Sequence, residues 1–218
     1  MTVVAISASY GAGGSRIAPA LARRLGVPFL DRAIPASVAA QLQVPLDEAE
    51  RCDERAEAGL LARLLASFRA ADAYVPAALP AEGPLAEDFQ QATEEVVRRQ
   101  AASGQGVILG RAAAFILREE PGVLRVRLDG PRERRVAQAM ALEGLDRADA
   151  ERRLRESDRA HGAYAQRFYG ADMRDPSLYQ LMIDSTALAL ERCVELIAIA
   201  AGALQQGAAG EGAGVVSP

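Results

Sequence analysis

Lysine is absent from this chain, and all 25 of its basic residues are arginine. No ammonium side chain can therefore form a Schiff base, act as a general base or bridge the phosphates of a nucleotide. The same absence excludes the lysine of the Walker A phosphate-binding motif. A positive side chain near an anionic ligand is then expected to be an arginine.

Cysteine and histidine are scarce, which limits the metal and redox chemistry open to the protein. Cys52 and Cys193 are far apart and form no CxxC pair, and His161 is the single histidine. A Cys/His zinc site and a disulfide framework are therefore not expected. Two buried thiols in a reducing cytosol are the simpler interpretation.

Long apolar runs and a basic charge balance are also missing. No stretch of about 18 apolar residues occurs, and the start of the chain lacks the pattern of a signal peptide. The net charge of −4 argues against a nucleic-acid binder, which usually needs a basic face. We expect a cytoplasmic protein that binds neither a membrane nor a nucleic acid, and the sequence leaves a homodimer open.

What is present is an alternation of two kinds of segment. Short apolar segments that predict strands are separated by segments in which apolar residues recur with helical spacing. The expected strands are 3–7, 29–31, 106–110, 123–129 and 180–184. This order predicts an α/β fold of three layers, in which helices cover both faces of a parallel five-stranded sheet. The 218 residues suit one domain, over 1–206, and the Gly/Ala-rich tail 207–218 is expected to be disordered.

The glycine-rich segment after the first strand is the main candidate for a ligand site. Ligands of open parallel sheets bind at the carboxyl ends of the strands, where this segment lies. Glycines before a helix let main-chain N–H groups approach an anion, and the helix start adds a partial positive charge. The segment Tyr10–Ser15 therefore predicts a phosphate-binding loop.

Two known fingerprints fit this loop incompletely, and a third interpretation needs no ligand. The dinucleotide motif GxGxxG fails at its third glycine, where Arg16 stands, although Asp31 lies where a ribose-binding acid could sit. The Walker A motif fails at Ala8, in place of the first glycine, and at Gly14, in place of the lysine. A tight strand-to-helix turn without a ligand is the remaining alternative.

Five segments in order resemble the cytidylate kinase-like family over residues 2 to 200. They are the loop region 6–18, the Phe-Leu-Asp-Arg segment 29–32, the Val-Ile-Leu-Gly-Arg segment 107–111, the arginine-rich and tyrosine-rich region 158–179, and the Ile-Asp-Ser-Thr segment 183–186 with the helix after it. The resemblance implies a P-loop nucleoside kinase-like fold with a helical acceptor-binding insert, about 32–104, and a lid, about 144–178. It also implies transfer of the ATP γ-phosphoryl group to a nucleoside monophosphate such as CMP, with ATP and Mg²⁺ as cofactors.

The resemblance also assigns roles to residues. Amides of the loop would hold the donor phosphates and the Ser15 hydroxyl would reach Mg²⁺, so the cofactor-binding residues are Gly11, Ala12, Gly13, Gly14, Ser15 and Arg16. The catalytic residues would be Asp31, Arg111 on the acceptor phosphate, and the lid arginines Arg155, Arg159 and Arg167.

Simpler roles compete with these. Ser15 or Asp31 could be helix caps only, and the lid arginines could pair with Glu151, Glu156 and Asp158 on a solvated helix.

The missing lysine leaves the activity open at this stage. Arg16 is the nearest replacement charge, although the helix could turn it away from the loop. Since one charge contact to a transferring phosphoryl group can be worth on the order of 10³-fold in rate, two hypotheses follow. One is an active kinase and the other is a catalytically weakened nucleotide-binding or sensing protein. A dinucleotide-dependent oxidoreductase is a third.

Overall fold

A parallel sheet forms the centre of the molecule, as the sequence predicts. The computed structural model describes residues 3–30, 84–110 and 112–211. Its five strands run parallel in the order β2-β3-β1-β4-β5. They are β1 (Val3–Ala8), β2 (Phe29–Leu30), β3 (Gly106–Leu109), β4 (Val123–Asp129) and β5 (Leu181–Asp184). The α/β class and the five-stranded parallel sheet are therefore confirmed.

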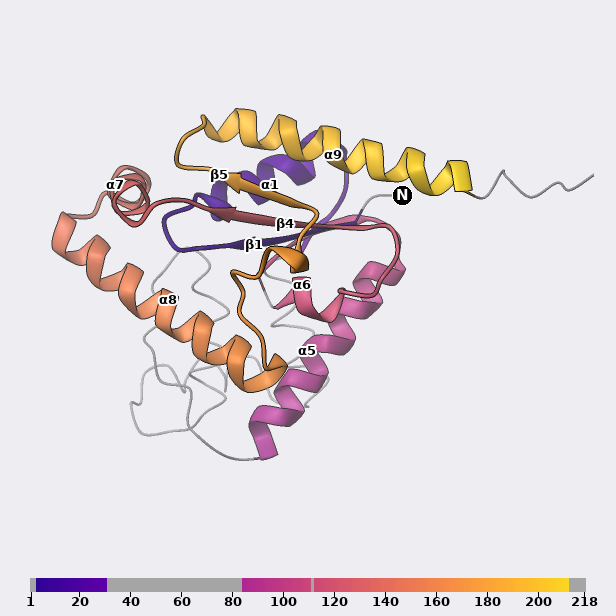
Figure 1. The fold of residues 1–218 in the computed structure, drawn as a ribbon, viewed down its shortest axis with the longest axis horizontal. Helices are drawn as coiled ribbons and strands as arrows, with labels where there is room; N and C mark the ends of the chain where they lie inside the picture. Colours follow the sequence, from indigo (N-terminus) through magenta and orange to yellow (C-terminus); the bar gives the residue numbers. More distant parts are fainter. Residues whose placement is uncertain (1–2, 31–83, 111, 212–218) are drawn as a thin grey trace, which may run out of the picture.

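Helices cover both faces of the sheet and its carboxyl edge. They are α1 (Gly14–Leu25), α5 (Pro84–Ala102), α6 (Ala113–Ile116), α7 (Arg132–Glu143), α8 (Arg147–Tyr169), the 3₁₀ turn η1 (Pro176–Leu178) and α9 (Leu190–Glu211). Figure 1 shows α1 and α9 on one face, α5 and α6 on the other, and α7 beyond the strand ends. None of the helices in the described ranges has both the length and the apolar character that crossing a membrane requires.

The alternation of side chains along β1 builds two separate cores. Val4 and Ile6 pack with α1 and α9, in a cluster that includes Leu21 and Ile197. Val3 and the other odd-numbered residues of β1 face α5 and α6 instead, because successive side chains of a strand point to opposite faces. Ser7 therefore lies on the α5/α6 side of the sheet, at the end of β1 that leads into the glycine loop.

The structure describes parts of the tail, the insert and the lid that the sequence predicts. The last helix, α9, continues to Glu211 and so extends into the segment 207–218 that the sequence predicts to be disordered. Residues 32–83 of the expected insert lie outside the described residues, and α5 is its described part. The region of the expected lid contains α8 and η1, and its function as a lid stays a prediction.

Two isoleucines on α9 test whether burial in this core stabilises the fold. Ile197 is fully buried, whereas Ile199, two residues later, is 70% exposed. We expect Ile197→Ala to lower the free energy of unfolding by about 2–5 kcal/mol, because it removes buried methyl groups and leaves a cavity. Ile199→Ala is expected to change it by less than about 0.5 kcal/mol. Urea denaturation measures both values, and equal losses would contradict this packing.

Candidate functional site

The glycine loop joins β1 to α1 through two residues in the left-handed conformation. Gly11 has φ +77° and Gly13 has φ +73°. A Cβ atom on Gly11 would lie 2.3 Å from the carbonyl oxygen of Arg135, and one on Gly13 would lie 2.9 Å from Leu190 Cδ2. Both positions therefore favour glycine for conformation, and Gly11 also requires it for space, because the atoms near it belong to the backbone of α7. The loop lies against α7 and against the Leu190 side chain of α9.

Four amide groups in the loop and at the start of α1 have no hydrogen-bond acceptor among the described residues. Gly13 is the N-cap of the helix, and no side chain caps it. The Ser9 amide donates to the Leu128 carbonyl, and the Ala12 amide donates to the Ser9 carbonyl, which fixes the beginning of the loop. Within the described ranges, no hydrogen bond uses the amides of Gly11, Gly13, Gly14 or Ser15. Such a group of N–H donors at a helix start suits an anion.

A buried arginine on β4 lies beneath the beginning of the loop. Arg127 is 5% exposed and belongs to the face of the sheet that also carries Ser7. Its guanidinium donates to Ser7 Oγ at 2.9 Å, to Ser9 Oγ at 2.7 Å and to Asp129 Oδ2 at 3.0 Å. One residue thus links the end of β1, Ser9 at the entry to the glycine loop, and the end of β4.

A second buried arginine, on α7, holds the next residue of the loop. Arg135 donates to the Tyr10 carbonyl at 3.1 Å and makes a two-pronged ion pair with Asp158 on α8, at 3.0 and 2.8 Å. Bidentate pairs of this kind fix geometry as well as charge. The Tyr10 hydroxyl also donates to Glu143, which accepts from Arg153 of α8. The loop is therefore connected to α8 by two routes that share Tyr10.

Asp129 is the anion that the two buried arginines share. Its carboxylate lies 3.0 Å from Arg127 and 3.6 Å from Arg135, and it accepts from the Gly130 amide. Burial alone would raise the pKa of this carboxyl, but the Gly130 amide and the Arg127 charge outweigh burial and hold the pKa below its usual range. Asp129 therefore stays ionised at neutral pH and compensates charge under the loop.

Most residues predicted to bind the cofactor lie in the glycine loop, and Arg16 lies just after it on α1. Ala12 is buried, and its carbonyl accepts from Ser185 Oγ at 2.7 Å. Ser15 is half-buried in the first turn of α1 and is not the N-cap, so the interpretation of Ser15 as a cap is wrong. Arg16 is exposed on the same turn. Asp31 and Arg111 lie outside the described residues, so their roles stay predictions.

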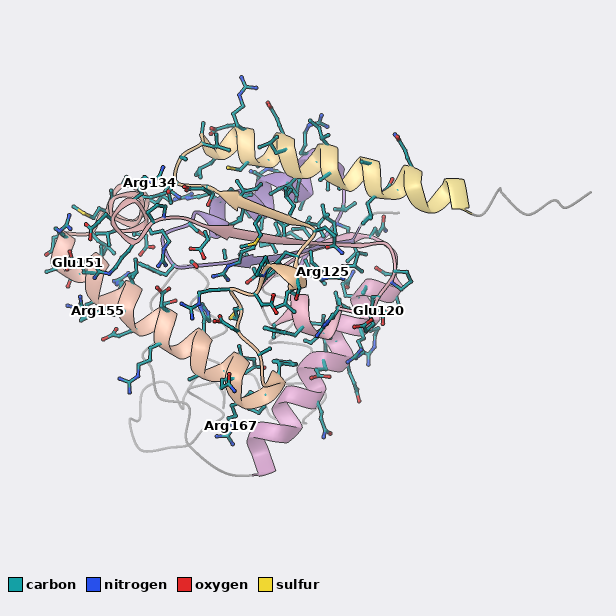
Figure 2. The ribbon with its side chains drawn as sticks, in the orientation of Figure 1. Glu120, Arg125, Arg134, Glu151, Arg155 and Arg167 are labelled. Carbon is teal, nitrogen blue, oxygen red and sulfur yellow. The ribbon has the colours of Figure 1, made fainter. Side chains whose placement is uncertain are left out.

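The lid arginines all lie on exposed positions of α8. Arg155 is 59% exposed and is 3.8 Å from Glu151, one turn earlier. Figure 2 shows this pair near the start of α8 and Arg167 at its other end. Arg159 is exposed, and the Arg167 guanidinium stacks over the Phe168 ring at 5.3 Å. Among the described residues, Arg135 contacts the loop at Tyr10, and Arg127 contacts Ser9 directly before it. The closure of the lid arginines over a phosphate stays a prediction.

Sequence reasoning missed the two arginines beneath the loop. The segment Arg-Val-Arg-Leu-Asp over 125–129 alternates charged and apolar residues inside a buried strand, and that alternation could have indicated a polar face. Arg135 gives no comparable signal, because its partners Asp158 and Tyr10 are distant in the chain. Gln138 was also missed: its buried side-chain nitrogen lies 3.1 Å from the position of a Gly13 Cβ.

Ser15 is the residue at the start of α1 whose hydroxyl suits a magnesium ion. Over the ranges that the structure describes, no three His, Cys, Asp or Glu side chains gather as metal ligands. Magnesium commonly keeps its waters and binds through one or two protein groups together with substrate phosphates. The half-buried Ser15 hydroxyl at the start of α1 could supply such a protein ligand.

A loop of this form between the central strand and a helix, at the carboxyl edge of a parallel sheet, defines an α/β fold of the P-loop kinase class. A gluconokinase from Sinorhizobium meliloti has the same fold, with a TM-score of 0.53, 16% identity, and coverage of 96% of this chain and 97% of that one. A protein of unassigned function from Eubacterium ventriosum gives a TM-score of 0.61 at 18% identity, covering 90% and 96%.

The sequence narrows this class to one family. A sequence model of the cytidylate kinase-like family matches residues 3–187, so the chain belongs to that family. A cytidylate kinase from Methanopyrus kandleri is 32% identical over 113 residues, which cover 47% of this chain. The match spans 58% of the length of that relative.

Two left-handed glycines test how tightly the loop is held. Gly11 meets the Arg135 backbone, whereas Gly26, at φ +67°, has open space around it. Gly26→Ala is expected to cost about 1–2 kcal/mol of unfolding free energy, for backbone conformation alone. Gly11→Ala is expected to cost about 1–3 kcal/mol more, because a backbone must shift. Urea denaturation of both variants measures the difference, and equal costs would show that α7 does not confine the loop.

Proposed function

We propose that this protein is a kinase that transfers the γ-phosphoryl group of ATP to a nucleoside monophosphate such as CMP. The observation that carries the proposal is the glycine loop, whose amides at Gly11, Gly13, Gly14 and Ser15 have no protein acceptor within the described ranges. Membership of the cytidylate kinase-like family supports the choice of donor and acceptor. In the reaction, an acceptor phosphate oxygen bonds to the γ-phosphorus, the bond to the β–γ bridging oxygen breaks, and ADP leaves.

Catalysis of this kind depends on position and charge more than on covalent chemistry. The loop would hold the donor phosphates through N–H groups, and Mg²⁺, held by Ser15 and the phosphates, would neutralise charge on them. Arg111 would hold the acceptor phosphate. Arg155, Arg159 and Arg167 would approach the γ-phosphoryl group if α8 moves, since each is exposed in this structure. Asp31 would orient the acceptor.

The proposed activity also implies the substrate, the location and the partners of the protein. We expect the substrate to be a small nucleotide and the protein to act in the cytoplasm without a membrane or nucleic-acid partner. A homodimer stays an open prediction.

A coupled assay of ADP release tests the proposal directly. We expect turnover with MgATP and CMP in a panel that also holds other nucleoside monophosphates and gluconate. Arg111→Ala should lower kcat/KM by about 10³-fold or more, because it removes a guanidinium from the reacting phosphates. Arg192→Ala is the control, since Arg192 is 71% exposed and pairs only with Glu195 of its own helix in the described part of the chain.

The other hypotheses predict different outcomes in the same experiment. Calorimetric binding of ATP without turnover of any acceptor would contradict the kinase and support a nucleotide-binding or sensing protein. Fluorescence titration with NAD, giving affinity where ATP gives none, would instead support the dinucleotide hypothesis.

A further inference from the structure

The position where Walker A loops carry lysine is closed to a side chain in this protein. Gly14 occupies that position, and a Cβ atom on it would lie 2.6 Å from the Ala8 Cβ and 3.3 Å from Leu109 Cδ1. Side-chain carbon atoms do not approach each other to 2.6 Å, so a residue larger than glycine at 14 requires Ala8 to move. Ala8 itself stands where the motif has its first glycine. Ala8 and Gly14, the two residues that depart from the Walker A motif, are therefore neighbours, and the side chain of Ala8 requires glycine at position 14.

The buried arginine of β4 contacts both neighbours of Ala8. Arg127 lies directly beside Ser7 in the β1–β4 register, and its guanidinium holds the hydroxyls of Ser7 and Ser9, on either side of Ala8. The side chain is 6% exposed, and its Nε is buried with no hydrogen-bond partner within the described part of the chain. A charge placed so deeply is costly unless its surroundings compensate it, and here Asp129 does so only from a partly exposed position.

Arg125, on the same face of the same strand, shows what an arginine with a purely structural role does here. Its guanidinium donates to the main-chain carbonyls of Leu178, Leu117 and Arg118. These contacts tie β4 to the segment before β5 and to the end of α6. They involve no residue of the glycine loop, whereas those of Arg127 fix the entry to it.

We propose that Arg127 is the positioning residue that replaces the Walker lysine for a polyphosphate ligand. The contact between Ala8 and position 14 excludes the lysine. The Arg127 guanidinium, through Ser7 and Ser9, then positions the loop so that the amides of Gly11, Gly13, Gly14 and Ser15 face one anion. The charge of Arg127 strengthens its hydrogen bonds to the two serines, because the interior has a low dielectric constant. The ligand class, a polyphosphate, rests on the proposed function.

Calorimetric titration with inorganic tripolyphosphate tests the role of Arg127 without involving a nucleoside or turnover. Arg127→Met is expected to weaken tripolyphosphate binding about tenfold or more, because it removes the charge-assisted hydrogen bonds to Ser7 and Ser9 that position the loop. Arg125→Met is the matched control: it removes a guanidinium from the same face of the same strand, and its affinity should stay within about threefold of the wild type. Wild-type affinity in folded Arg127→Met would overturn the proposal.

A rescue experiment separates this role from a contribution to folding alone. In the Arg127→Met background, Ala8→Gly with Gly14→Lys should restore tripolyphosphate affinity. Without the Ala8 methyl group, the lysine side chain at position 14 fits and can contact the phosphates. Gly14→Lys with Ala8 retained should not restore it. Equal rescue by both variants, or rescue by neither, would overturn the proposed exchange of lysine for Arg127.

Two further measurements keep the proposal testable in every case. If Arg127→Met does not fold, Ser9→Ala decides, because it leaves the guanidinium in place and cuts its contact with the loop; unchanged tripolyphosphate affinity would then overturn the proposal. A wild-type protein that binds tripolyphosphate but phosphorylates no acceptor refutes the kinase while leaving the role of Arg127 intact. A wild-type protein without tripolyphosphate affinity refutes the role of Arg127.

Discussion

The register between β1 and β4 is the constraint on which the rest of the site depends. It sets Ser7 beside Arg127, and the alternation of β4 then directs the odd-numbered residues of that strand to the face away from α1 and α9. The guanidinium is thereby delivered to the beginning of the glycine loop from a buried strand. A slip of one residue would turn Arg127 into the apolar core and Leu128 toward the loop.

The loop is shaped from three sides, and this explains why so many of its residues are small. The Arg135 backbone confines Gly11, Leu190 and Gln138 confine Gly13, and Ala8 confines Gly14. Since a loop held this closely is already ordered, a ligand would lose little affinity to ordering it. The connections through Tyr10 to Glu143 and through Arg135 to Asp158 extend the same order to α8, so the helix with the lid arginines is placed by the loop.

The sequence predicts the fold well because its signals are local. β-Branched and apolar runs mark the strands, and Gly26 and Gly144 end α1 and α7 in the left-handed conformation, so these elements need no tertiary information. The site is predicted less well because its contacts are long-range. Arg127 and Ser9 are 118 residues apart, and the pairing of Arg135 with Asp158 depends on how α7 and α8 pack. The family resemblance implies roles for arginines of α8, whereas the described arginines at the loop and its entry are Arg135 of α7 and Arg127 of β4.

Amide chemical shifts give the most direct test of the central claim, which is that main-chain N–H groups of a lysine-free loop bind a polyphosphate. In a protein labelled with ¹⁵N and titrated with MgATP, the account predicts downfield shifts of the amide protons of Gly11, Gly13, Gly14 and Ser15 that saturate together. Gly26, which is exposed at the opposite end of α1, serves as the internal reference. Saturating ATP that leaves the four loop resonances in place, while others move, would contradict the account.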